Sequence, residues 1–322
     1  MKKPKYEVGD QRGAKFCAEC HEEIYEEWRA NSRHAQATTA ASFNDFKEMF
    51  TGVFMYKAMM GGEAMCYACH GIKEVNDGVN CETCHGTLLP AETVEDSIEV
   101  THEKKYLPGR EQMKKAEFCL KCHTMVNPLS GVPLMGLKAS YLKSQAAAQG
   151  TTCQDCHMKP RESELRYHGF DTAVRNVEIY RDDLDIKDVA LEFPNFSLSI
   201  ENRVMGHSIP AGGGTRTLGL EISFIDNRGK RIHQIITTFA KKYNQMPVFG
   251  LMPYKLLEDT QLQSGEARRL EFTLPASLNG QISEVVLTMK LYEVSDEHEG
   301  DITKAYWTSE PFFEKRMNFP TL

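Results

Sequence analysis

The chain has 322 residues, of which 41% are hydrophobic, and carries a formal net charge of −7. A chain of this length forms one or two globular domains. No stretch reaches the run of about 18 apolar residues that a transmembrane helix needs, and the acidic balance excludes the basic surface typical of nucleic-acid-binding proteins. We therefore expect neither a membrane span nor a nucleic-acid partner.

The chain is expected to divide near residue 172, because helical patterns precede that point and strand patterns follow it. The first helical pattern places His21, Tyr25 and Trp28 on one face, with glutamates mostly on the other. The helices predicted before the boundary cover residues 20–31, 43–60 and 138–148. This organisation predicts an α+β protein with a mainly helical, loop-rich domain at 1–172 and a second domain at 173–322.

One five-residue pattern, Cys-x-x-Cys-His, occurs five times in the first domain. It includes all 10 cysteines of the chain, so none is left over for a disulfide framework. We number the copies motifs 1 to 5 in chain order. They are Cys17-Ala-Glu-Cys20-His21, Cys66-Tyr-Ala-Cys69-His70, Cys81-Glu-Thr-Cys84-His85, Cys119-Leu-Lys-Cys122-His123 and Cys153-Gln-Asp-Cys156-His157.

Paired cysteines of this kind bind either zinc or haem. A zinc site made of two pairs leaves one of the five pairs over and does not account for the histidines. In a haem c site, two cysteines at i and i+3 lie on one face of a helical turn and match the two vinyl groups of a porphyrin, and the next His reaches the iron. The pattern therefore predicts five covalent haems, whose proximal ligands are His21, His70, His85, His123 and His157.

The five motifs lie close together in the sequence, between residues 17 and 157. So little protein cannot build a separate pocket for each porphyrin. We therefore expect the haems to pack against one another and to form much of the core themselves. Close packing of this kind is what rapid electron transfer between haems requires.

The cofactor also predicts the cellular compartment. Haem c is attached outside the bacterial or archaeal cytoplasm, so we expect an exported protein, periplasmic or extracellular. The first residues, MKKPKYEVGDQRGAKF, are charged and lack the apolar region of a signal peptide. We therefore expect a leader that has been cleaved or is missing from this sequence.

Residues 173–322 have the pattern of a β-sheet domain. Apolar and polar residues alternate at 196–202, 217–226, 268–275 and 284–294, as in strands with one buried face. Asp226-Asn227-Arg228-Gly229-Lys230 has the composition of a hairpin turn. Six or seven strands in this length predict an antiparallel β-sandwich, which we interpret as immunoglobulin-like.

The sixth iron ligand decides what each haem can do. A second His closes the iron and gives an electron carrier, a Met closes it at higher potential, and an open iron can bind substrate. His34 lies thirteen residues after His21, and a continuous helix would place it on nearly the opposite face. It therefore reaches a haem other than that of motif 1, or else it is an ordinary polar residue at a helix end.

A family resemblance adds further ligands. Trp28-x-x-x-Ser32-x-His34, GVNCETCHG followed by His102, and CQDCHMKP followed by His168 resemble segments of multihaem c-type cytochromes. The resemblance covers residues 16–170 and is to the superfamily of tetrahaem cytochromes c, hydroxylamine oxidoreductases and pentahaem nitrite reductases. It implies that His34, His102 and His168 are distal ligands. The Lys-ligated catalytic motif of the nitrite reductases is absent here, so the resemblance does not imply their activity.

The second domain contributes one further candidate. Gly206-His207-x-x-Pro210 resembles a loop in the β-rich C-terminal parts of multihaem cytochromes, where its His caps a haem, and the alternative is a Gly-rich turn or an anion-binding backbone nest. For His233 we expect a structural role in the sheet, and for His298 an exposed loop. The methionines near the motifs are more typical of a core than of ligands. The fifth distal ligand is therefore left open between His233, His298, a Met, a neighbouring subunit and none.

These observations favour an exported pentahaem c-type cytochrome that transfers electrons along closely packed, mostly bis-His haems. Its partners are then redox proteins, among them other cytochromes. Two alternatives are a subunit of an extracellular cytochrome filament and an oxidoreductase acting on a small nitrogen or sulfur species at one open haem. We expect an electron carrier rather than an enzyme.

Overall fold

A computed structural model describes most of the chain in two compact units. The helical unit comprises Met1–Cys122 and Thr152–Arg175, and the strand unit comprises His123–Thr151 and Asn176–Leu322. The segment 123–151 precedes the boundary expected near residue 172, but it belongs to the strand unit. The described residues are 13–38, 67, 69–71, 75–87, 110–124, 126, 130–133, 135–162, 165–171, 177–212, 216–245, 253–294 and 305–319.

Several expectations concern residues outside the described ranges. These are the helix predicted at 43–60, Cys66 of motif 2, the candidate ligand His102, the loop residue His298 and the methionines near the motifs.

The described part of the helical unit consists of short helices. Helix α2 confirms the prediction at 20–31 to within two residues. The helices are α1 (Ala14–Ala18), α2 (Glu22–Asn31), η1 (His34–Gln36), the π-helical turn η2 (Thr83–Thr87), α6 (Arg110–Met113), α7 (Ala116–Leu120) and α10 (Cys153–His157). None of the helices described in either unit combines the length and the apolar character that crossing a membrane requires.

Few apolar side chains are buried in the helical unit. Among its described residues they are Ala14, Trp28, Ala116 and Leu120, and two of the four are alanines. The indole of Trp28 is fixed by a hydrogen bond of 2.9 Å from its Nε1 to the carbonyl oxygen of Val79. So small an apolar protein core is what we expect where porphyrins supply much of the packing.

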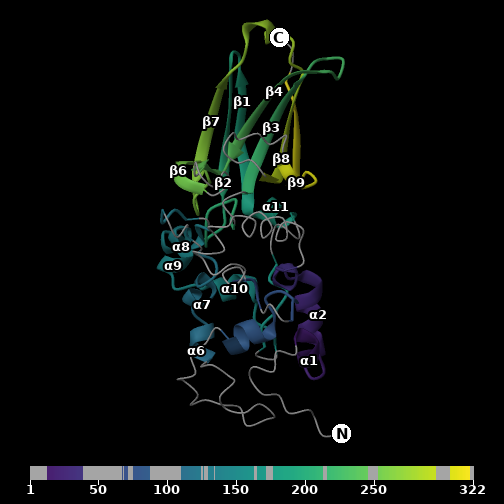
Figure 1. Ribbon diagram of the computed structural model, residues 1–322. Helices are drawn as coiled ribbons and strands as arrows, with labels where there is room; N and C mark the ends of the chain where they lie inside the picture. Colours follow the sequence, from purple (N-terminus) through teal and green to yellow (C-terminus); the bar gives the residue numbers. More distant parts are fainter. Residues whose placement is uncertain are drawn as a thin grey trace. The chain divides into compact units, whose positions relative to one another are not determined.

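The strand unit contains two larger antiparallel sheets and a hairpin (Figure 1). One sheet has the order β1-β2-β7 and the other β10-β8-β3-β4, with β9 beside β8. The hairpin is β5-β6. The strands are β1 (Leu184–Glu192), β2 (Asn195–Asn202), β3 (Arg216–Ile225), β4 (Arg231–Phe239), β5 (Lys241–Gln245), β6 (Pro253–Asp259), β7 (Ala267–Thr273), β8 (Glu284–Val294), β9 (Ala305–Thr308) and β10 (Phe313–Asn318).

The four predicted strands are confirmed as β2, β3, β7 and β8, and the alternation that predicted them produces the core. Leu198 and Ile200 of β2 and Leu220 and Ile222 of β3 are fully buried. The two sheets meet at an edge-to-face pair of aromatic rings, Phe196 of β2 and Phe224 of β3, with centroids 5.3 Å apart. Such pairs add about 0.5–1.5 kcal/mol beyond the area that they bury.

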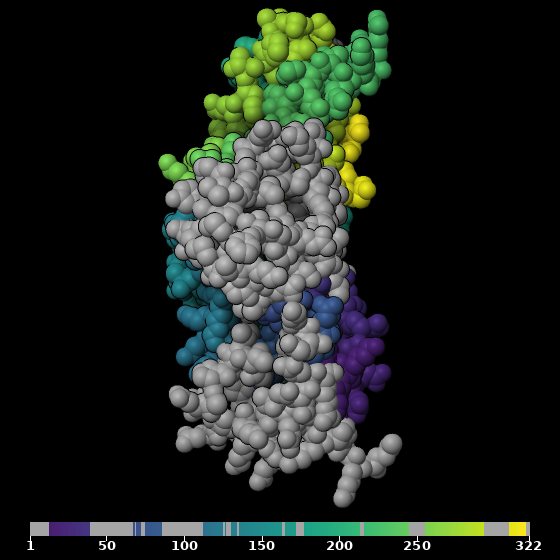
Figure 2. All heavy atoms as spheres, viewed as in Figure 1, coloured from purple at the N-terminus to yellow at the C-terminus, as the bar shows by residue number. Residues whose placement is uncertain are grey.

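The predicted hairpin turn at 226–230 is also confirmed. The Asp226 carboxylate accepts hydrogen bonds of 2.9 Å from the backbone N–H groups of Arg228 and Lys230. Gly229 adopts a φ of 78°, which favours glycine. The turn joins β3 to β4 and projects at the upper right of Figure 2, in green.

The helix predicted at 138–148 is divided in two. Helix α8 ends at Leu142, and α9 begins after Ser144, whose Oγ accepts a hydrogen bond of 3.2 Å from the backbone N–H of Ala147. Ser144 is therefore an N-cap, and a capping serine competes with helix continuation. The described helices of the strand unit are α8 (Leu137–Leu142), α9 (Gln145–Ala148), α11 (Ile179–Asp183) and η4 (Ala276–Leu278).

Candidate haem-binding site

The described motif residues lie on or next to helical turns, as the haem interpretation requires. Motif 5 forms α10 from end to end. In motif 1, Cys17 lies in α1, and its carbonyl oxygen accepts hydrogen bonds from the backbone N–H groups of Cys20 (3.2 Å) and His21 (2.9 Å). In motif 4, the N–H of Cys122 donates to the carbonyl oxygen of Cys119 at 3.2 Å. These turns place each pair of cysteines on one face.

A reciprocal cap begins the helix of motif 5. The backbone N–H of Thr152 donates to the Asp155 carboxylate at 2.9 Å, and the Thr152 side chain accepts from the backbone at Asp155. Asp155 also forms an ion pair of 3.1 Å with Arg166. The Arg166 guanidinium in turn donates to the carbonyl oxygens of Gln154 and Met158. These contacts hold the segment that leads to His168 against α10.

Three hydrogen bonds join thiols of different motifs among the described cysteines. Cys17 of motif 1 hydrogen-bonds with Cys81 of motif 3, and this bond lowers the pKa of Cys17. Cys69 of motif 2 hydrogen-bonds with Cys122 of motif 4, which lowers the pKa of Cys69 to about 7. A third hydrogen bond joins Cys119 of motif 4 to Cys153 of motif 5.

The thiols of motif 4 lie near thiols of three other motifs. Hydrogen bonding to Cys153, burial and the nearby Cys84 thiol together raise the pKa of Cys119. Cys84 belongs to motif 3, so motif 4 neighbours motifs 2, 3 and 5. The nine cysteines that the structure describes are all free thiols, the form to which haem is attached.

Four of the candidate histidines donate a hydrogen bond through Nδ1 to a backbone carbonyl oxygen. A carbonyl only accepts, so Nδ1 carries the proton and Nε2 carries the lone pair that binds a metal. The pairs are His70 with Ala37 (2.9 Å), His157 with Asp171 (3.1 Å), His168 with Arg166 (2.7 Å) and His207 with Ser208 (3.0 Å). The donor set therefore fits haem iron.

Burial supports the same protonation state. It lowers the pKa of His70 and of His168, and this keeps the imidazoles neutral. A neutral imidazole is the form that binds iron. Among the described residues, no three His, Cys, Asp or Glu side chains are arranged to hold a metal ion by themselves.

His85, the expected proximal ligand of motif 3, lies near the candidate distal ligand His168. Their ring centroids are 6.3 Å apart, and the planes differ by 28°. Two imidazoles on opposite sides of one metal place their centroids about 6 Å apart, given metal–nitrogen bonds of about 2.0–2.1 Å. Phe170 contacts His168 edge-on at 6.1 Å. The pair therefore has the separation of two ligands on one iron.

His168 is held by an ion pair that the sequence did not reveal. Its backbone N–H donates to Glu27 at 3.1 Å. Glu27 forms a short ion pair with Arg161, and both side chains are mostly buried. Glu27 lies on α2, more than a hundred residues away in sequence, so no local pattern could have identified it.

His34 lies at the start of η1, just after α2 ends. Ser32 has an extended backbone, and its Oγ accepts a hydrogen bond of 3.0 Å from the backbone N–H of His34. The imidazole of His34 contacts Phe170 edge-on, with ring centroids 4.6 Å apart. Gly78, just before motif 3, has a φ of 78° and lies against the backbone of His34, where a Cβ would meet the carbonyl oxygen at 2.2 Å. The helix therefore does not continue to His34, and His34 is held beside motif 3.

His207 lies in the loop between β2 and β3, as predicted. Its carbonyl oxygen accepts a hydrogen bond of 3.2 Å from Asn202, and the loop contacts the helix that precedes motif 5 through Met205 and Ala146. His233 lies on β4, where its ring contacts Phe224 at 5.8 Å, as expected for a residue with a structural role.

Comparison with known proteins points to cytochromes. Residues 16–86 match the family described as cytochrome c554 and c-prime. No curated protein matches the chain.

One solved structure resembles the whole chain. A penta-heme cytochrome c552 from Thermochromatium tepidum superposes with a TM-score of 0.73 at 19% sequence identity, covering 97% of this chain and 100% of that chain. A beta-glucuronidase from Bacteroides uniformis has a TM-score of 0.18 at 14% identity, covering 43% and 13% of the two chains. MtrC from Shewanella baltica OS185 has a TM-score of 0.16 at 14% identity, covering 78% and 44%. Scores this low carry no structural argument.

Proposed function

We propose that this chain, a multihaem c-type cytochrome with five covalently bound haems c, carries electrons along a row of closely packed haems and catalyses no bond chemistry. The observation that carries the proposal is the contact of cysteine thiols between motifs. Haems attached at motifs whose thiols are in contact would lie close to one another. The haem irons supply one-electron redox chemistry when bound.

The residues that we propose to hold the haems come from the five motifs and from the family resemblance, and the imidazole geometry of His168 and His207 supports two of them. Thioether bonds form at Cys17, Cys20, Cys66, Cys69, Cys81, Cys84, Cys119, Cys122, Cys153 and Cys156. The proximal ligands are His21, His70, His85, His123 and His157. The distal ligands are His34, His102, His168 and His207, of which His168 serves the haem of motif 3.

The thiol contacts also suggest the path of an electron. Motif 1 contacts motif 3 through Cys17 and Cys81. Motif 3 neighbours motif 4 through Cys84, and motif 4 contacts motifs 2 and 5 through Cys122 and Cys119. We infer the order 1–3–4, with the haems of motifs 2 and 5 both beside that of motif 4. The haem of motif 4 is then a branch point.

The remaining expectations complete the proposal. The protein is exported to the periplasm or beyond, because haem c is attached there. The five motifs define a pentahaem domain at residues 1–172, although the segment 123–151 within it belongs to the strand unit. Residues 173–322 form an immunoglobulin-like sandwich, which the contact between the β2 and β3 sheets supports. The partners are redox proteins, and a cytochrome filament is an alternative that electron microscopy of native material would test.

The test of carrier against enzyme is turnover. The dithionite-reduced protein should deliver about five electrons per chain to a soluble oxidant in a stopped-flow experiment, one per haem. Mixed with nitrite, hydroxylamine or sulfite and a viologen donor, it should show no sustained donor oxidation. Steady turnover of any of these compounds would support an open, catalytic haem instead.

A further inference from the structure

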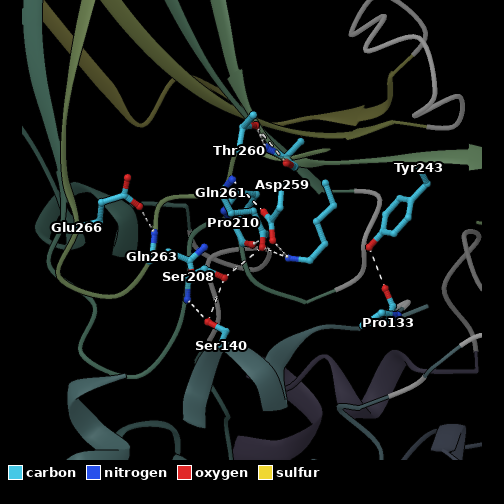
Figure 3. Close-up of polar contacts among 12 residues, drawn as sticks. Pro133, Ser140, Ser208, Pro210, Tyr243, Asp259, Thr260, Gln261, Gln263 and Glu266 are labelled. Carbon is cyan, nitrogen blue, oxygen red and sulfur yellow. Dashed lines mark hydrogen bonds and ion pairs between the residues drawn. The ribbon is translucent and has the colours of Figure 1, made fainter. Parts of the chain in front are cut away.

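A row of buried hydrogen bonds joins three side chains of the strand unit (Figure 3). Ser140 Oγ donates to Ser208 Oγ at 3.1 Å, and Ser208 Oγ donates to Gln261 Oε1 at 3.2 Å. Gln261 Nε2 donates in turn to the carbonyl oxygen of Pro210 at 2.5 Å. All three side chains belong to residues that are at most 8% exposed. Each donor in this row has one acceptor, so the row is directed from Ser140 to Pro210.

The row connects two segments that are distant in sequence. Ser140 lies on α8, in the stretch that separates motif 4 from motif 5. Ser208 directly follows His207, and its backbone N–H also donates to Ser140 Oγ, at 2.5 Å. Gln261 follows β6 and accepts a further short hydrogen bond from Lys241.

Two further hydrogen bonds, one between backbone groups and one from a side chain, reinforce this attachment. The backbone N–H of Ala146 donates to the carbonyl oxygen of Met205 at 3.0 Å. The hydroxyl of the fully buried Tyr243 donates to the carbonyl oxygen of Pro133 at 2.9 Å (Figure 3). The segment between motifs 4 and 5 is therefore bound at two points to the loop between β2 and β3 and at a third point to β5.

Buried polar side chains need a physical reason at such a place. A buried donor without a partner destabilises the fold, whereas apolar residues of the same shape carry no such penalty. A fully satisfied row instead selects one arrangement of the segments that it joins, because a shift of either one breaks several bonds. The residue that this arrangement fixes most directly is His207, whose Nδ1 donates to the carbonyl oxygen of Ser208.

We propose that Ser140, Ser208 and Gln261 are positioning residues that lock the His207 loop onto α8 and so fix the imidazole of His207 for iron binding. This inference rests on the proposed role of His207 as a distal ligand. It goes beyond that role because it gives the strand unit a function of its own, which is to hold a ligand against the segment between two haem-binding motifs.

The test compares buried serines with different neighbours. Ser140→Ala removes the acceptor of the Ser208 N–H. Ser309→Ala is the matched control, since Ser309 is equally buried in the strand unit and its Oγ accepts the backbone N–H of Leu291 at 2.9 Å. Gln261→Met keeps the side-chain length without its hydrogen bonds and serves if Ser140→Ala does not fold. The readout is the high-spin ferric signal in electron paramagnetic resonance.

We expect Ser140→Ala and Gln261→Met to convert up to one of the five haems to the high-spin form, while Ser309→Ala produces none. Ser140→Thr, which retains the hydroxyl, should restore the low-spin signal. If His207→Ala yields a high-spin haem but Ser140→Ala and Gln261→Met behave like Ser309→Ala, the positioning inference is wrong and the ligand role stands. If His207→Ala leaves the spectrum unchanged, the ligand role itself is wrong.

Discussion

At the scale of the residue, the proton on Nδ1 of the imidazoles matters most, because it leaves Nε2 available to bind iron. The motif cysteines and their histidines could be identified from spacing alone, because thioether attachment demands that spacing. The features that orient the distal ligands could not. Phe170, Glu27 and Arg161 act on His34 or His168 through contacts made only in the folded chain. A single sequence contains no local signal for such contacts.

The residue-scale prediction concerns His168. His168→Ala should leave the iron bound by His85 without a second protein ligand and convert about one haem to the high-spin form, because the two rings have the separation of two ligands on one iron. Visible absorption and electron paramagnetic resonance of the ferric protein measure this change. His233→Ala is the control, since that ring packs on Phe224 in the sheet and should leave all haem signals intact. Equal spectra for the two variants would contradict the assignment.

At the scale of the element, alternation located four of the ten strands that the structure describes, and turn composition located the hairpin between β3 and β4. The expected total of six or seven strands was too low. The predicted strand 284–294 coincides with β8, and the turn at Asp226 forms as its composition indicates. The helix at 138–148 was predicted less well, because Ser144 caps a new helix where periodicity alone favours continuation. The sequence predicted that His207 lies between two strands. It did not predict the row of hydrogen bonds that holds the His207 loop.

The cap of α10 gives a prediction on pH. Hydrogen bonds, chiefly from the backbone N–H of Thr152, lower the pKa of Asp155 below its ordinary value of 3.8. The carboxylate therefore stabilises the fold above pH 3.8, and this contribution disappears as the pH falls through the lower pKa of the folded state. Asp155→Ala should lower the thermal midpoint at pH 6 and converge with the parent protein near pH 2. Glu162→Ala, at an exposed position of the same unit, should have the thermal midpoint of the parent protein at both pH values.

The contact between the sheets gives a prediction on stability. Phe224→Ala should lower the free energy of unfolding of the strand unit by about 3–5 kcal/mol, because it opens a cavity beside Phe196 in a fully buried site. Ile236→Ala on β4 removes a side chain that is 46% exposed and should change it by less than about 0.5 kcal/mol. Denaturant titration followed by far-ultraviolet circular dichroism measures both. Similar losses would show that Phe224 does not carry the packing.

At the scale of the whole molecule, the two units differ in what holds them together. The strand unit buries a continuous set of aliphatic and aromatic side chains, whereas the described part of the helical unit buries few. This small number of buried apolar side chains in the described part is what we expect if haems supply much of the core of the helical unit. The sequence indicated this from the density of motifs, but the neighbours of each motif emerged only from the folded chain, since thiol contacts join cysteines up to 64 positions apart, Cys17 and Cys81.

The central claim is that this protein conducts electrons through closed irons. Bis-imidazole ligation keeps an iron low-spin in both oxidation states, so little rearranges when an electron arrives, whereas an open iron binds small molecules. The most direct measurement is electron paramagnetic resonance of the fully oxidised protein, combined with carbon monoxide addition to the reduced protein. We predict no substantial high-spin ferric signal and almost no change with carbon monoxide. A full equivalent of high-spin haem that binds carbon monoxide would contradict the account and favour an enzyme.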